Sequence, residues 1–185
     1  MAVRYIGTPA RSFPGPATPN LSTYFHPITI LGGTSAMTTI QANRLYYLPH
    51  YLPGLTVTKI SLEVSTLAAG NVRMGLYTNA AGAPGSLISG TDVGAISTGT
   101  TGVKENTFSS AVTLPDDWVW AACLFDAAPQ CIMGTAANTG ILGSSGINVA
   151  GTSRGYYAAQ AYGALPAAAP TPTVTGQAPA VCLRI

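Results

Sequence analysis

Charged residues are scarce in this chain of 185 residues. They make up 8% of it, whereas about 25% is usual for soluble globular proteins. The eight Lys and Arg nearly balance the six Asp and Glu, and a net charge of +2 argues against a nucleic-acid partner held by a basic surface. Disorder is unexpected too, because disordered chains are poor in apolar residues and 47% of this chain is hydrophobic.

Long apolar runs and metal-like cysteine spacing are also missing. The uncharged stretches 127–153 and 155–183 are broken by prolines and glycines, whereas a membrane-spanning helix needs about 20 mostly apolar residues in a row. Residues 1–13 lack the apolar segment of a signal peptide. We therefore expect no membrane span and assembly in a reducing cytoplasm. The odd number of cysteines predicts buried, reduced thiols at Cys123, Cys131 and Cys182.

A helical period is absent as well. No stretch of ten or more residues combines a 3.6-residue repeat with capping signals, and Gly, Pro and Asn divide the chain into short apolar runs. In the clearest run, 58–65, apolar Ile60, Leu62 and Val64 alternate with polar residues. This period of two places one face in a core and the other in water. The pattern predicts an all-β domain, a sandwich or a barrel, over residues 28–185.

Residues 1–27 differ from the rest because five prolines fall within them. Proline removes a backbone donor and fixes φ, so this segment reads as an extended arm. An extended segment with spaced aromatic residues can lie across a neighbouring surface at a low entropic cost. We therefore predict that the arm docks on another chain, with a flexible leader as the alternative. The docking residues are predicted to be Tyr5, Phe13, Tyr24 and Phe25.

The run 118–126 is apolar on both faces, which predicts cover on both faces. One cover is the opposite sheet, and the other is a loop, the arm or a neighbouring subunit. Scarce charge favours the neighbour, because exposed surfaces are usually about 25–35% charged. We therefore predict an obligate oligomer whose interface contains Val119, Ala121 and Phe125.

Residues for catalysis are not grouped in recognisable motifs. Asp116 and Asp117 are adjacent and follow Pro115, which predicts a turn rather than a pair of glycosidase carboxylates. The sequence holds two histidines, no Gly-x-Ser-x-Gly elbow and no Gly-x-x-x-x-Gly-Lys phosphate loop. We therefore predict that the protein is not an enzyme and has no catalytic residues, metal or cofactor.

Aromatic clusters are the better indication of binding. Flat aromatic rings can stack on sugar rings while neighbouring polar groups fix the orientation. The alternative is packing in a core or an interface, with each tyrosine hydroxyl at a wet edge. The candidate ligand-binding residues are Tyr46, Tyr47, His50, Tyr51, Tyr156 and Tyr157.

Part of the chain resembles a known class of module. Residues 72–79 and 82–88 look like a hairpin that recurs in jelly-roll modules, and Trp118-Val119-Trp120-Ala121-Ala122 looks like the aromatic strand that follows it. These modules are similar to carbohydrate-binding β-sandwiches and occur in fibres, tail tips and head decorations of tailed bacteriophages. The resemblance covers roughly residues 55–126, and the Ala/Gly/Thr-rich composition is also similar to phage virion proteins.

This resemblance implies an antiparallel jelly-roll-like β-sandwich in a non-enzymatic virion protein. Its partners would be itself, as a homotrimer, and other virion proteins bound through the arm 1–27. Host surface polysaccharide would be a further partner, and the site of action would be a tail, a fibre or a capsid surface. The alternative from a different class is a stand-alone carbohydrate- or receptor-binding module.

Overall fold

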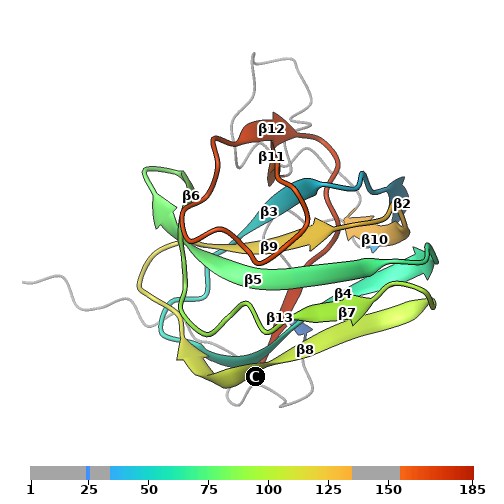
Figure 1. Cartoon of the computed structure of the whole chain (residues 1–185). Coiled ribbons are helices and arrows are strands. Elements are labelled where there is room, and N and C mark those ends of the chain that lie inside the picture. Colours follow the sequence, from blue (N-terminus) through green and yellow to red (C-terminus); the bar gives the residue numbers. More distant parts are fainter. Residues whose placement is uncertain (1–23, 26–33, 135–154) are drawn as a thin grey trace, which may run out of the picture.

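Two antiparallel sheets packed face to face make up the structure, which is a computed structural model (Figure 1). It describes residues 24–25, 34–134 and 155–185. The predicted all-β fold with antiparallel sheets is confirmed. Within the described ranges, no helix is long and apolar enough to cross a membrane.

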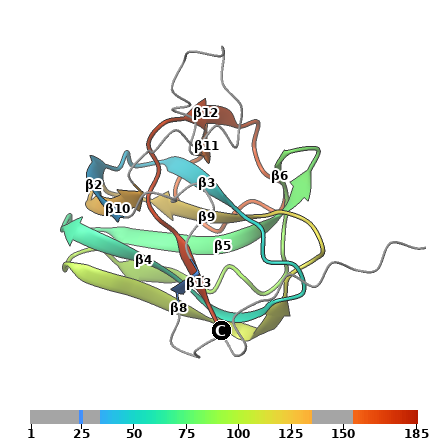
Figure 2. The ribbon, with the colours of Figure 1, turned by 180° about the vertical axis from the view of Figure 1, so that it is seen from behind.

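Sheet A has six strands, centred on the long strand β4. One side of β4 pairs with β8, while the other pairs with β13 along one half and with β10 along the other. Figure 2, seen from behind, shows β13 lying along β4 near the C-terminus. The strands are β1 (Tyr24–Phe25), β2 (Thr34–Thr39), β4 (Thr56–Thr66), β8 (Gly102–Thr113), β10 (Gln130–Gly134) and β13 (Cys182–Arg184).

Sheet B has seven strands in the order β12-β11-β3-β9-β5-β6, with β7 also paired to β5. Strand β9 lies in the middle, and all seven of its residues are buried. The strands are β3 (Arg44–His50), β5 (Asn71–Ala80), β6 (Ala83–Leu87), β7 (Ala95–Ser97), β9 (Val119–Phe125), β11 (Gly155–Ala159) and β12 (Thr173–Thr175).

The main core lies between the two sheets and follows the period of two that the sequence shows. Ile60, Leu62 and Val64 of β4 point into it, with exposed fractions of 2% or less. Strands β5 and β9 contribute the facing residues from sheet B, among them Met74 and Val119. Alternation of apolar and polar residues in β4 thus places one of its faces in the core and the other outside.

The hairpin β5–β6 turns through Ala81 and Gly82, which both have positive φ angles of 52° and 86°. Positive φ at both central residues matches the twist of the flanking strands, and glycine adopts it without strain. The turn brings Pro84 opposite Asn79, near one end of sheet B.

The sandwich includes two residues that the sequence assigned to the arm. Tyr24 and Phe25 form β1, which pairs with Arg184 and Leu183 of the same chain, and Phe25 packs against the main core. Both residues thus belong to sheet A of their own chain, so the sandwich starts before residue 28. Tyr5 and Phe13 lie outside the described residues.

Candidate functional site

The outer face of sheet B is covered by the chain itself. Residues 160–169, which we call the strap, follow β11 and cross this face. In the strap, Leu165 is 5% exposed and packs with Tyr47, Trp120 and Leu124 in a second apolar cluster separate from the main core. One face of the sheet is therefore closed without a second subunit.

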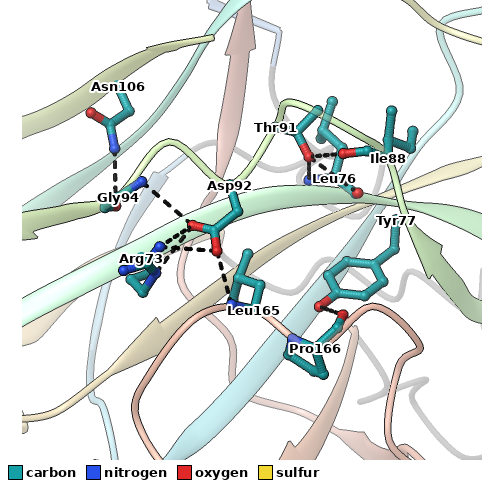
Figure 3. Close-up of polar contacts among 10 residues, drawn as sticks. All are labelled: Arg73, Leu76, Tyr77, Ile88, Thr91, Asp92, Gly94, Asn106, Leu165 and Pro166. Atoms are coloured by element: carbon teal, nitrogen blue, oxygen red, sulfur yellow. Dashed lines mark hydrogen bonds and ion pairs between the residues drawn. The ribbon is translucent and has the colours of Figure 1, made fainter. Parts of the chain in front are cut away.

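The Asp92 carboxylate holds the strap in place (Figure 3). It accepts two hydrogen bonds from the Arg73 side chain, both 3.1 Å long, and one of 2.9 Å from the backbone N–H of Leu165. Nearby, the Tyr77 hydroxyl donates to the carbonyl of Pro166 at 2.8 Å. Charged and neutral hydrogen bonds thus fix the backbone of the strap against β5.

This arrangement corrects the placement of the predicted interface residues. Val119, Ala121 and Phe125 lie in the main core between the sheets, each 0% exposed. The opposite face of β9 carries Trp120 and Leu124, which the strap covers. The double cover predicted for β9 is present, and the same chain supplies it. The predicted oligomer therefore needs a different surface.

Next to the covered area, three side chains form a row across the end of sheet B. Tyr51 directly follows β3 and Trp118 directly precedes β9, so the pairing of His50 with Val119 places them opposite each other. Their ring centres are 5.3 Å apart with an angle of 40° between the planes. Asn79 of β5 lies on the other side of Trp118, because Thr78 pairs with Val119.

Hydrogen bonds connect this row to the buried face. The Trp120 indole N–H donates to the Asn79 side-chain oxygen at 3.2 Å, and the Asn79 amide donates to both Asp117 oxygens at 3.3 Å. Asp117 also accepts the backbone N–H of Trp118 at 2.7 Å. Asp117 is exposed, as is the neighbouring Asp116. We call the three side chains of this row, Tyr51, Trp118 and Asn79, together with the adjoining Asp117, the aromatic row.

Of the six predicted ligand-binding residues, Tyr51 is exposed, at 42%. Tyr46, Tyr47 and His50 are buried to 4% exposure or less, and a His50 ring nitrogen lies 3.0 Å from the carbonyl oxygen of Val181. Burial raises the pKa of both tyrosine hydroxyls. All three side chains are packed within this chain, Tyr46 in the main core and Tyr47 in the second apolar cluster on the outer face of sheet B, as the alternative interpretation of the aromatic clusters proposed.

Two further residues of the six predicted for ligand binding are half-buried and lie on β11: Tyr156 and Tyr157. Tyr156 packs against the Trp120 ring at 5.2 Å, and the Arg44 guanidinium lies 4.5 Å from the centre of the Tyr157 ring. Their ring contacts are therefore to side chains of their own sheet.

The outer face of sheet A carries a cluster of ion pairs. Glu105 accepts from Lys59 at 2.7 Å and from Arg184 at 3.1 Å. Burial alone would raise the pKa of Glu105, but the hydrogen bonds and charges of both cations outweigh burial and lower it. The Arg184 guanidinium also lies 5.2 Å from the centre of the Tyr24 ring. Strands β1, β4, β8 and β13 are thus tied together by charge at this face.

A mostly apolar hollow of about 120 Å³ lies beside this cluster. Two large apolar residues at its rim are exposed, Tyr24 at 37% and Val103 at 52%. Glu63 of β4 is a charged residue in its lining. The full lining consists of Tyr24, Ser61, Leu62, Glu63, Val103, Ile132, Ala180 and Cys182.

The three cysteines are buried and form no disulfide, as the sequence predicts. Burial raises the pKa of Cys131 and of Cys182 to about 12, and it also raises that of Cys123. No group of three or more His, Cys, Asp or Glu side chains in the described part of the chain is placed to hold a metal ion. Comparison with protein-family models, curated proteins and solved structures finds no match to this chain.

The sequence analysis predicted neither the aromatic row on sheet B nor the hollow on sheet A. It treated Trp118 as strand packing and Asp117 as part of a turn, and it singled out neither Asn79 nor Val103. The signal for the hollow was weak but present, since Val103 is an apolar residue directly before the charged Lys104-Glu105. The aromatic row depends on which residues pair across β3, β9 and β5, and local patterns do not contain that information.

Proposed function

We propose that this chain is a non-enzymatic structural protein of a phage virion, which assembles with copies of itself and contacts host glycans. The observation that supports self-assembly lies on the outer face of sheet A, where the exposed side chains of Tyr24 and Val103 flank an apolar hollow. The strap already covers the matching face of sheet B. Exposed apolar side chains around a hollow are typical of a surface that binds another protein.

A second copy of this chain is the proposed occupant of that face. At 8% charged residues, the chain has few charges to keep an apolar surface from associating. Self-association usually closes into a cyclic oligomer, and the trimer follows from the resemblance to fibre and decoration modules. We propose a jelly-roll type for the sandwich, again on the basis of that resemblance.

The arm, residues 1–27, is proposed to anchor the module on other virion proteins. The chain enters the sandwich through β1, at the edge of sheet A and beside the hollow. Anchoring and self-association would then use neighbouring surfaces. Tyr24 belongs to the hollow, so the proposed anchoring residues are Tyr5 and Phe13.

The mass of the full chain in solution, measured by light scattering, tests the assembly. We expect the mass of three chains for the wild type and of one chain for Val103→Lys, because the lysine and Glu63, which lies opposite it in β4, would both have to be desolvated at the interface. Val174→Lys is the matched control, since Val174 is also an exposed strand valine, at 46% against 52% for Val103. A wild-type monomer, or a trimer that survives Val103→Lys, contradicts this interface.

A stand-alone carbohydrate-binding module is the second candidate, favoured by the exposed ring of Tyr51 against Trp118. It differs from the first in predicting a monomer that binds glycan. Both candidates exclude turnover, so a polysaccharide incubated with the protein should keep its chain length. Shortening of the polysaccharide would contradict both.

A further inference from the structure

We infer that the aromatic row binds a neutral sugar ring, with Tyr51 and Trp118 stacking on the ring and Asn79 and Asp117 binding its hydroxyls. This inference rests on the glycan-binding part of the proposed function and names its site. It involves the end of sheet B next to β6 and is separate from the hollow on sheet A.

The two aromatic rings provide an apolar surface of the right kind. They lie 5.3 Å apart and are tilted by 40°, and Tyr51 is 42% exposed while Trp118 is half-buried. The apolar C–H faces of a pyranose ring pack on aromatic faces, whereas an isolated exposed tyrosine would offer a single ring. A half-buried tryptophan is held in place by its surroundings and loses little freedom when a ligand binds.

Polar groups stand at the edge of this surface. The Asp117 carboxylate is exposed and accepts hydrogen bonds. The two 3.3 Å contacts of the Asn79 amide nitrogen with Asp117 can be made by one N–H shared between the two oxygens, which leaves the second N–H for a ligand. Neighbouring hydroxyls of a sugar can donate to the carboxylate and accept from the amide. Aromatic faces with a few fixed polar groups at their edge are typical of small-molecule sites.

The polar edge is held in position before any ligand binds. Trp120, 2% exposed, donates its indole N–H to Asn79, which leaves the Asn79 amide nitrogen directed at Asp117. The backbone N–H of Trp118 also donates to the Asp117 carboxylate, at 2.7 Å. Groups held in this way cost less conformational entropy on binding than free side chains.

Charge selects against acidic sugars at this site. Asp116 and Asp117 are both exposed, and neither takes part in the three ion pairs of the described residues. Two uncompensated carboxylates repel a uronic or sialic acid, whereas they accept hydrogen bonds from neutral hydroxyls. The ligand class is therefore a neutral hexose unit of a surface polysaccharide.

The test is titration of the full chain with dextran, mannan and galactan as neutral probes and polygalacturonate as the acidic probe, followed by calorimetry. We expect at least one neutral probe to bind and polygalacturonate to bind more weakly. Trp118→Ala, Tyr51→Ala and Asp117→Ala should each weaken binding about tenfold or more, as the loss of an interface anchor does. Tyr51→Phe keeps the ring and should bind nearly as the wild type does.

Leu67→Ala is the matched control, because Leu67 is also an exposed large apolar side chain, at 54%, and directly follows β4 of the other sheet. Its affinity should not change, and circular dichroism should show that every variant keeps its strands. If Trp118→Ala and Tyr51→Ala still bind glycan, the aromatic row is not the binding site, although the proposal that the protein contacts glycans is kept. The inference is wrong if none of the neutral probes binds or if polygalacturonate binds most tightly. The trimer is tested independently, by light scattering.

Discussion

Leu165 of the strap packs directly over Gly75, in the middle of strand β5. A Cβ atom built on Gly75 would lie 2.7 Å from the Leu165 side chain. Residue 75 sits opposite Ala122 of β9, so two small residues in neighbouring strands create the space that Leu165 fills. The closed outer face of sheet B thus depends on the absence of a side chain at one position.

A larger residue at position 75 should therefore displace the strap. We expect Gly75→Val to destabilise the fold by about 1–3 kcal/mol through overpacking, measured by urea unfolding. Protease cleavage within residues 160–169 should become faster. Leu165→Ala added to Gly75→Val should recover part of the loss, since it removes the clashing group. Additive losses in the double variant would show that the two residues do not share this space.

Loss of the Asp92 carboxylate should release the same segment by a different route. Asp92→Ala removes the partner of Arg73, whose side chain is 22% exposed, and the acceptor for the Leu165 N–H. We expect a loss of about 2–3 kcal/mol in unfolding free energy, because a partly buried guanidinium is left without its partner. Asp116→Ala, at an exposed carboxylate, should change stability by no more than about 0.5 kcal/mol. Equal effects of the two variants would contradict the role of Asp92.

The alternation of residues in β4 was sufficient to predict two-sided strands and an all-β fold, whereas the antiparallel arrangement was predicted from the resemblance to jelly-roll modules. The lack of such alternation in the run 118–126 predicted that β9 is covered on both faces, and the structure confirms it. This pattern could not show what covers the outer face, because the strap has no period and is fixed by contacts such as Asp92 with Leu165, 73 residues apart. The scarcity of charge therefore suggested a subunit interface where the chain covers itself.

The candidate binding residues were harder to predict for the same reason. Tyr46 and Tyr47 are neighbours in the sequence, but in a strand they point to opposite faces, and both of these faces are buried. Tyr51 lies just beyond the strand and is exposed. Its partner Trp118 is 67 residues away, and only the register of β3 with β9 brings the two together.

Thiol reactivity should report the integrity of the core. Cys131 and Cys182 have pKa values raised to about 12 by burial, and thiolate is the reactive form. We expect the native protein to react with a thiol reagent at pH 8 at less than about one hundredth of the rate of free cysteine. All three thiols should react at once in guanidinium chloride. Fast labelling of the native protein would contradict the burial of these residues.

Acid should selectively remove the contribution that the Glu105 carboxylate makes to the stability of the fold. Its folded-state pKa lies below the ordinary value of 4.5 because Lys59 and Arg184 outweigh the opposing effect of burial. The stabilisation is therefore fully present above the unfolded-state pKa and is lost as the pH falls through the lower, folded-state pKa.

Glu105→Gln should consequently cost about 1–2 kcal/mol at pH 7, because two cations remain close together without the carboxylate between them. The difference from the wild type should shrink below pH 4.5 and vanish once the carboxyl is protonated in the folded state. Glu63→Gln serves as the control, since Glu63 is exposed in the same sheet and is not part of the ion pairs described. A cost for Glu105→Gln that persists unchanged in acid would mean that the side chain stabilises sheet A by packing, and that its charge does not.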